Sequence, residues 1–294
     1  MRALAGAALS PAYLLLAYRY RLPGLRFRID FALLALRFLL SRNTEISSAD
    51  IYRLLFWPMH STRYFEFDFM WRSLADVPIQ NYLDVSSPRL FPILLLSKRL
   101  EMAAELVNPD KKDLQETARF IRACNLDTRC HLRDSPAENA PFAPQSFDAI
   151  TTISVVEHIP RDRDAVVKMW ELLKAGGRLL LSVPCAAVAE EQFLDVDHFG
   201  LQTPDENGFF FHEHIYDQSL LEERFYSVMG SPARFAIYGE TKAGSLLEGL
   251  LKYWSGRGYP LWKEPFAMAQ EFRRYESLSD LPGEGVIAME FIKK

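Results

Sequence analysis

A glutamate–histidine pair directly after an apolar run is the first feature of this sequence with the chemistry of a catalytic group. Glu157 and His158 follow the run Phe147–Ile153, whose apolar and β-branched composition suits a buried strand. An imidazole titrates near neutral pH, so His158 could remove a proton from a hydroxyl. Alternatively, the pair could cap the turn into the next helix and order the loop.

A second cluster of acids and histidines lies further along the chain, in Asp195-Val-Asp197-His198 and in His212-Glu-His214. These histidines could supply a base or contact a substrate. With Asp195 or Asp197 they could also ligate a metal ion, because imidazole and carboxylate groups are common ligands of divalent metals. Ordinary loop packing is the third interpretation, since His212 and His214 would lie on one face of a strand.

Apolar runs alternate with amphipathic stretches from about residue 80 onward, which is typical of a parallel sheet with helical crossovers. The expected strands are Asn81–Val85, Ala103–Val107, Thr128–Leu132, Phe147–Ile153, Arg178–Val183, Ala233–Tyr238 and Gly285–Ile292. The expected helices are Leu90–Leu100, Asp110–Ala123, Asp164–Lys174 and Gln218–Met229, the third of them ending at Gly176-Gly177. This order predicts one doubly wound α/β domain, in which ligands bind at the carboxyl ends of the strands.

The first 44 residues are both apolar and basic. They carry seven arginines and one acid, Asp30, although the formal net charge of the whole chain is −4. Their apolar blocks are shorter or more interrupted than the roughly 20 apolar residues that a membrane-spanning helix needs. Three interpretations stay open: two helices packed on the domain, an interfacial anchor on an anionic inner membrane surface, and a cleaved signal.

The composition of the chain excludes several classes of protein. With 294 residues, 49% of them hydrophobic and 24% charged, it is an ordinary globular chain and not a disordered one. The slightly acidic balance predicts no nucleic-acid partner. Cys124, Cys130 and Cys185 form no C-x-x-C pair, which excludes a disulfide scaffold and indicates a reducing compartment. We therefore expect a cytoplasmic protein, with peripheral contact to the inner membrane face if residues 1–44 are an anchor.

Four stretches follow one another between Asp134 and Pro184: Ala137–Phe142, Ser146–Ile150, Val156–Pro160 and Leu172–Pro184. In order and spacing they resemble the second half of a class I S-adenosylmethionine-dependent methyltransferase, of the large bacterial group (type 11-like) that contains ubiquinone and small-molecule methyltransferases. The resemblance implies a Rossmann-like, doubly wound, seven-stranded sheet for residues 76–294. It leaves residues 1–75 as an N-terminal helical arm and residues 240–280, approximately, as a late aromatic insertion.

The resemblance also implies S-adenosyl-L-methionine as the cofactor. In the family, the methionine part lies over the turn after the first strand, the ribose at the end of the second strand and the adenine after the third. The matching cofactor-binding positions, together with Ser154 after the fourth strand, are Asp84, Ser86, Ser87, Arg89, Asn108, Asp110, Asp134, Glu138 and Ser154. The catalytic candidates are His158, His198 and His212, and no metal is expected.

Two parts of this expected site depart from the pattern of the family, the first turn and the end of the second strand. Its first turn is rich in glycine, which permits φ > 0 and a close approach of the backbone. Here the three glycine positions hold Ser86, Pro88 and Leu90, and Asn108 stands where the family has an acid. The turn is either an alternative cradle, in which the serines and Arg89 meet the amino-acid end of the cofactor, or part of a decayed site.

Two aromatic segments could border the site. In the segment 61–71, Arg63, Tyr64 and Glu66 could close over the cofactor, or the segment could be an amphipathic helix that buries its aromatic residues. The late insertion could form a wall for the acceptor or cover one end of the sheet; its members are Trp254, Tyr259 and Trp262. The sequence thus predicts a methyltransferase acting on a small-molecule, lipid-linked or glycan-linked acceptor, or alternatively an inactive methyltransferase-like binding or scaffold protein.

Overall fold

The computed structural model describes residues 2–197, 200–245, 248 and 261–294, and an eight-stranded sheet forms its centre. The strand order is β3-β2-β1-β4-β5-β10-β8-β9. The strands are β1 (Asn81–Val85), β2 (Ala103–Val107), β3 (Cys130–Arg133), β4 (Phe147–Ile153), β5 (Leu173–Cys185), β8 (Arg234–Glu240), β9 (Phe272–Tyr275) and β10 (Gly285–Ile292). A separate pair is formed by β6 (Glu190–Leu194) and β7 (Phe210–Ile215).

The sheet is parallel from β3 to β5, and β10 runs antiparallel to both of its neighbours. The strand order reverses between β1 and β4, which is where open α/β sheets bind ligands. The α/β class and the doubly wound order are confirmed, whereas the expected count of seven strands is wrong. The additional strand is β9, which lies within the expected late insertion and pairs with the edge of β8.

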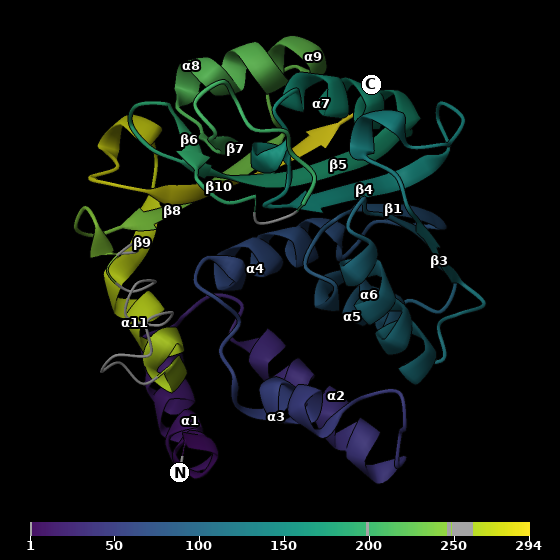
Figure 1. The fold of residues 1–294 in the computed structure, drawn as a ribbon, viewed down its shortest axis with the longest axis vertical. Coiled ribbons are helices and arrows are strands. Elements are labelled where there is room, and N and C mark those ends of the chain that lie inside the picture. The colour runs from purple at the N-terminus through teal and green to yellow at the C-terminus, as the bar shows by residue number, and fades with distance from the viewer. Residues whose placement is uncertain (1, 198–199, 246–247, 249–260) are drawn as a thin grey trace.

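Helices cover both faces of the sheet (Figure 1). On one face lie α7 (Asp162–Leu172), α8 (Gln218–Leu221) and α9 (Ser227–Met229), the last two joined by a π-helical turn at Glu222–Tyr226. On the other face lie α4 (Arg63–Leu74), α5 (Leu90–Lys98) and α6 (Lys111–Ala123), with α2 (Arg26–Leu40) and α3 (Ser48–Phe56) beyond them. At the edge of the molecule, α1 (Arg2–Arg19) packs beside α11 (Glu264–Glu271).

The end of α7 differs from the sequence-based expectation. The helix ends at Leu172, and Gly176 with φ +75° lies inside β5 instead of closing the helix. Leu173 already pairs with Phe147, and the ladder resumes with Arg178 opposite Ala149, so the intervening residues form a bulge. The left-handed conformation of Gly176 therefore belongs to the bulge in β5 and does not terminate α7.

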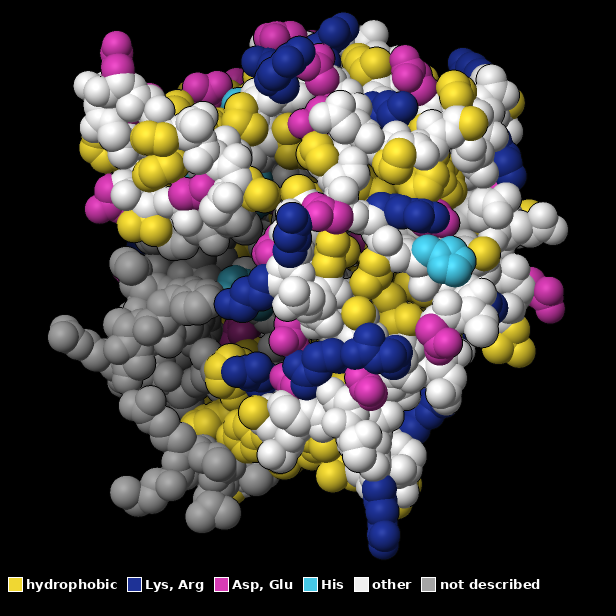
Figure 2. Space-filling view, turned by 45° about the vertical axis from the view of Figure 1, so that its right-hand side comes forward, with side chains coloured by type: hydrophobic (Ala, Val, Ile, Leu, Met, Phe, Trp, Pro, Cys, Tyr) yellow, Lys and Arg dark blue, Asp and Glu magenta, His cyan; other side chains and the backbone are white. Residues whose placement is uncertain are grey.

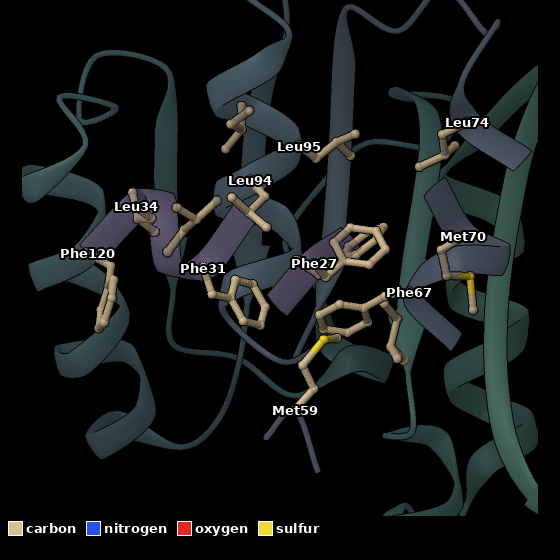
Figure 3. Packing of buried hydrophobic residues seen from close by; sticks show 14 of the residues in the cluster. Phe27, Phe31, Leu34, Met59, Phe67, Met70, Leu74, Leu94, Leu95 and Phe120 are labelled. Atoms are coloured by element: carbon tan, nitrogen blue, oxygen red, sulfur yellow. The ribbon is translucent and has the colours of Figure 1, made fainter. Parts of the chain in front are cut away.

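The N-terminal helices share a hydrophobic core with α5, α6 and one face of the sheet (Figure 3). The fully buried ring of Phe27 in α2 lies 5.5 Å from the ring of Phe67 in α4, measured between centroids. Phe67 in turn contacts Phe91 in α5 at 5.1 Å. The packed-helix interpretation thus describes the inner face of α2. α4 buries Phe65 and Phe67 as expected, but it is buried on most of its sides, with nine of its twelve residues buried, and is therefore not an amphipathic helix.

Surface charges of both signs lie close together on the face shown in Figure 2. Ion pairs also connect the helices of this part of the chain, since Arg119 of α6 pairs with Asp50 of α3 at 3.1 Å and with Glu116 at 2.8 Å. Within the described part of the chain, no helix has the length and apolarity needed to cross a bilayer.

We predict that residues 1–75 unfold together with the sheet domain, because they share one core. Phe27→Ala should lower the free energy of unfolding by about 3–5 kcal/mol, the usual cost of truncating a buried phenylalanine. Urea denaturation followed by circular dichroism would measure it. Leu33→Ala on the exposed side of the same helix is the matched control and should change stability by less than about 0.5 kcal/mol. If the N-terminal helices unfolded in a separate transition at lower urea concentration, and Phe27→Ala shifted only that transition, the shared core would be contradicted.

Candidate functional site

A cavity of about 670 Å³ lies at the carboxyl ends of β1, β2 and β4. Most of the predicted site residues line it: Ser86, Ser87, Asn108, Asp110, Glu138, Ser154 and His158. Apolar side chains form much of the remaining wall, including Val85, Pro136 and Ile159. A few polar groups on an apolar background, in a volume of this size, are typical of a small-molecule site.

The glycine-free turn after β1 keeps the backbone shape that glycine would normally provide. Ser86 has φ +52°, in the left-handed region. Its N–H and its hydroxyl both donate to the carbonyl of Val107, at 2.9 and 3.1 Å, which fixes this conformation. Pro88 lines the cavity without filling it, and Leu90 borders a different hollow.

Asp84 lies beneath this turn as a buried carboxyl group. It accepts hydrogen bonds from the Tyr82 hydroxyl at 3.0 Å, the Thr151 hydroxyl at 2.6 Å and the Ser87 N–H at 3.0 Å. Burial raises the pKa of Asp84 to about 6, although these hydrogen bonds act in the opposite direction. The Ser87 hydroxyl accepts from the Ile153 N–H at 3.1 Å. Asp84 and Ser87 therefore connect the ends of β1 and β4 under the cavity.

The polar groups at the end of β2 form one hydrogen-bonded set. The Asn108 amide donates to Asp113 at 3.0 Å, and its oxygen accepts from the Asp110 N–H at 2.8 Å. The Asp110 carboxylate caps α6 by accepting from two backbone N–H groups. Asp113, which the sequence analysis did not select, lines the cavity and also pairs with Arg89. Its position in the first turn of a helix was the only sequence signal for it.

Four predicted residues in the described part of the chain do not line the cavity: Asp84, Arg89, Asp134 and His212. Asp84 lies beneath the turn, and the His212 carbonyl oxygen contacts the ring of His158. Arg89 borders a neighbouring hollow of about 350 Å³, on the other side of Asp113. Asp134 is exposed and lies 3.5 Å from the ammonium group of Lys111. The structure thus brings most of the predicted cofactor residues to the cavity, but places Arg89 and Asp134 away from it.

A buried glutamate from α4 reaches the same edge of the sheet. Glu66 accepts from the hydroxyls of Ser154, at 2.5 Å, and Ser182, at 2.7 Å, and pairs with Arg63 at 2.6 Å. Burial alone would raise the pKa of Glu66, but the Arg63 guanidinium and the two hydroxyls lower it below its usual value. Arg63 lines the cavity. Tyr64 is instead fully buried, and its hydroxyl accepts from the Met59 N–H.

The catalytic candidates His158 and His212 lie next to each other, with ring centroids 5.3 Å apart. The Nδ1 atom of His158 is 2.8 Å from the carbonyl oxygen of His212. Burial lowers the pKa of His158, which keeps the imidazole neutral and able to accept a proton. Burial raises the pKa of Glu157 to about 8 and that of Glu213 to about 7.

The other members of the second cluster have separate environments. His198 lies outside the described residues, as do Trp254 and Tyr259 of the expected acceptor wall. His214 is buried, 3.9 Å from Asp162 and 3.4 Å from Glu191. Asp197 accepts from the N–H groups of Gly200 and Gln202 and orders that loop. Gln202 itself lines the cavity, a role that nothing in its sequence context indicated.

This fold is that of the class I methyltransferases. The structure is similar to geranyl diphosphate C-methyltransferase from Streptomyces coelicolor A3(2), solved with Mg²⁺, geranyl diphosphate and S-adenosyl-L-homocysteine. The TM-score is 0.50 at 13% identity, covering 84% of this chain and 80% of that chain. A geranyl diphosphate methyltransferase in complex with S-adenosylmethionine (SAM) gives a TM-score of 0.51 at 13% identity, over 84% and 88% of the two chains.

The sequence comparisons agree with the fold. Residues 93–181 match the family described as a methyltransferase domain. A stretch of 64 residues is 34% identical to the ubiquinone/menaquinone biosynthesis C-methyltransferase of Rhizobium meliloti. That match covers 22% of this chain and 25% of the relative, so the chain spans about a quarter of the length of the curated relative it matches. The resemblance to SAM-dependent class I methyltransferases is confirmed.

We predict that Asp84 makes the stability of the protein depend on pH between about 4 and 6. In this interval the unfolded chain loses the proton while the folded protein keeps it, so the free energy of unfolding falls as the pH rises. The rise of the pKa from 3.8 to about 6 corresponds to about 3 kcal/mol. Asp84→Asn removes this ionisation, and its stability relative to the wild type should increase by that amount between pH 4 and pH 7.

Urea titrations at both pH values would measure the difference. The exposed Asp127, changed to Asn, is the matched control and should leave the pH dependence unaltered. An equal pH dependence in the wild type and Asp84→Asn would show that folding does not raise the pKa of the carboxyl at the end of β1.

Proposed function

We propose that the protein is a SAM-dependent methyltransferase and that the cavity at the ends of β1, β2 and β4 binds the cofactor. The observation that carries the proposal is that this cavity stays open beside the glycine-free turn, because Ser86 adopts the left-handed backbone in place of glycine. SAM supplies an electrophilic methyl carbon on a sulfonium group. The protein then has to align donor and acceptor, and it needs a base only if the acceptor holds its proton tightly.

The residues at the cavity fit this cofactor by their chemistry. Asn108 and Asp113 offer an amide and a carboxylate to the hydroxyls of a ribose. Glu138 lies at the expected adenine end. Arg63 provides the guanidinium that suits the carboxylate of the methionine part, in the role that the sequence analysis gave to Arg89. Neutral His158 is the base for an acceptor that carries a proton.

The acceptor that we propose is a small molecule or a lipid- or glycan-linked hydroxyl. Leu201 and Gln202, from the loop after β6, line the cavity beside His158 and would border the acceptor. The alternative is an inactive protein that keeps the fold and uses it for binding. Methyl transfer from labelled SAM into the small-molecule or lipid fraction of a cell extract tests the two, because an inactive protein transfers no label.

We predict that S-adenosylhomocysteine binds in this cavity. At 100 times its Kd the ligand should stabilise the protein by about 2.7 kcal/mol, measured as a thermal shift and by calorimetry. Glu138→Ala should raise the Kd about tenfold or more, since a hydrogen bond to a charged group contributes about 1.5–3 kcal/mol. Glu101→Ala, at an exposed site away from the cavity, is the matched control. Absence of binding by the wild type would favour the inactive protein, and an unchanged Kd in Glu138→Ala would show that the adenine end is misplaced.

We also propose that the N-terminal arm contacts an anionic membrane surface. The outer face of α2 exposes four large aliphatic side chains at helical spacing: Ile29, Leu33, Leu36 and Leu40. Exposed arginines lie on the same arm, and Arg19, Arg21 and Arg26 line a hollow of about 1040 Å³ between the arm and β8. Apolar side chains beside arginines are the combination that binds at the interface of anionic bilayers.

Replacing Leu33, Leu36 and Leu40 together by serine should reduce co-sedimentation with phosphatidylglycerol vesicles at least tenfold. These side chains are exposed, so the fold should tolerate the change. Leu100→Ser is the control, because Leu100 is equally exposed but lies outside the arm. The proposed membrane contact would be contradicted if the wild type did not bind the vesicles, or if the variant bound them as well as the wild type does.

A further inference from the structure

We propose that His158, His212 and Glu213 form a binding site for one divalent transition-metal ion of the zinc type at the wall of the cavity. One ligand atom from each residue lies within 4.8 Å of the other two. All three side chains are partly buried. They come from two segments, the turn after β4 and strand β7, that meet only in the folded protein.

A bulge in β7 places two neighbouring residues at one point. Gln192 of β6 pairs with Glu213, but the next residue, Phe193, pairs with Phe211, so His212 is an additional residue in the ladder. In a regular strand, adjacent side chains point to opposite faces. A bulge redirects the side chain, and such bulges are common beside functional sites. Here it lets His212 and Glu213 both approach His158.

The hydrogen bond of His158 sets the orientation that a metal ligand needs. Its Nδ1 atom lies 2.8 Å from the His212 carbonyl oxygen. A carbonyl oxygen only accepts, so Nδ1 carries the hydrogen and Nε2 carries the lone pair. Imidazoles that bind metals are commonly held by such a hydrogen bond from the second ring nitrogen to a carbonyl or carboxylate group.

A buried carboxyl group beside the three residues independently points to a cation. Glu157 is 2% exposed, and its Oε1 atom lies 4.0 Å from His158 Nε2. Its Oε2 atom is buried and has no hydrogen-bond partner within the described residues. Buried polar atoms are normally paired, and an unpaired one costs free energy. An ion held by His158 would provide the missing electrostatic partner.

Two imidazoles and one carboxylate are one of the ligand sets of catalytic zinc sites, which keep a further position open for water or substrate. Because His158 lines the cavity, a bound ion would have that position available to an oxygen atom of the acceptor. The ion would then occupy the Nε2 lone pair and, by making that oxygen more acidic, would take the place of His158 as the base. This role rests on the proposed methyltransferase function, whereas the binding of the ion does not. The sequence predicts no metal here, and the bulge that unites His212 and Glu213 has no local sequence signature.

The test is a titration of the full, metal-stripped chain with Co²⁺ and with Zn²⁺. We expect one Co²⁺ per chain, with visible absorption bands that report nitrogen and oxygen ligands, and displacement of Co²⁺ by Zn²⁺. His212→Gln and Glu213→Gln should each weaken binding at least tenfold. His131→Gln is the matched control, because His131 is an exposed histidine on β3, away from the cavity.

Circular dichroism establishes that the variants are folded, and a folded variant of either residue is sufficient to decide. No binding of Co²⁺ or Zn²⁺ by the wild type, or a single site whose affinity is unchanged in the folded variants, would overturn the proposal. S-adenosylhomocysteine binding is measured on the same samples. If S-adenosylhomocysteine does not bind, the methyltransferase function is overturned, but the result of the metal titration still stands. If S-adenosylhomocysteine binds normally but Co²⁺ and Zn²⁺ do not, only the metal site is overturned.

Discussion

The cavity depends on the hydrogen bonds that tie the end of β1 to the end of β4. The Thr151 hydroxyl and the Ser87 N–H both donate to the buried carboxyl group of Asp84, and the Ser87 hydroxyl accepts from Ile153. Each of these polar groups is buried, so each requires a partner, and the hydrogen bonds that supply these partners hold the turn in place. Serine replaces glycine here because the Ser86 hydroxyl stabilises the left-handed backbone through the Val107 carbonyl.

A second buried carboxylate makes the N-terminal helices part of the site. Glu66 of α4 receives hydrogen bonds from Ser154 at the end of β4 and from Ser182 in β5, while its neighbour Arg63 faces the cavity. The ion pair between Glu66 and Arg63 compensates the cost of burying the carboxylate. The arm is therefore connected to the sheet both by its hydrophobic core and by this polar contact.

Three backbone irregularities lie at or beside the cavity, although others, such as the left-handed residues Asn125 and Gln145, lie elsewhere in the fold. Ser86 and Ser154 both have positive φ, and β7 carries its bulge at His212. Left-handed conformations of residues other than glycine cost free energy and persist where surrounding contacts stabilise them. The contacts are present in each case: Ser86 bonds to Val107, Ser154 to Glu66, and the His212 carbonyl accepts from His158. At these three positions the irregular backbone brings polar side chains to the cavity and its wall.

The sequence by itself determined the elements whose residues form a local pattern. The buried runs Asn81–Val85, Ala103–Val107, Phe147–Ile153 and Gly285–Ile292 predicted four strands with their observed bounds, because an apolar run needs only its own residues to be recognised. The order of strands and helices then predicted the class of fold and the edge of the sheet at which the cavity lies.

Only the tertiary structure decided what depends on contacts between distant residues. Phe272–Tyr275 is a strand because it pairs with β8, and α7 ends early because Leu173 already pairs with Phe147. His158 meets His212, 54 positions later, through a bulge that is defined by its partner strand. Such positions follow from packing and hydrogen bonding across the whole chain, and no short window of sequence contains both partners.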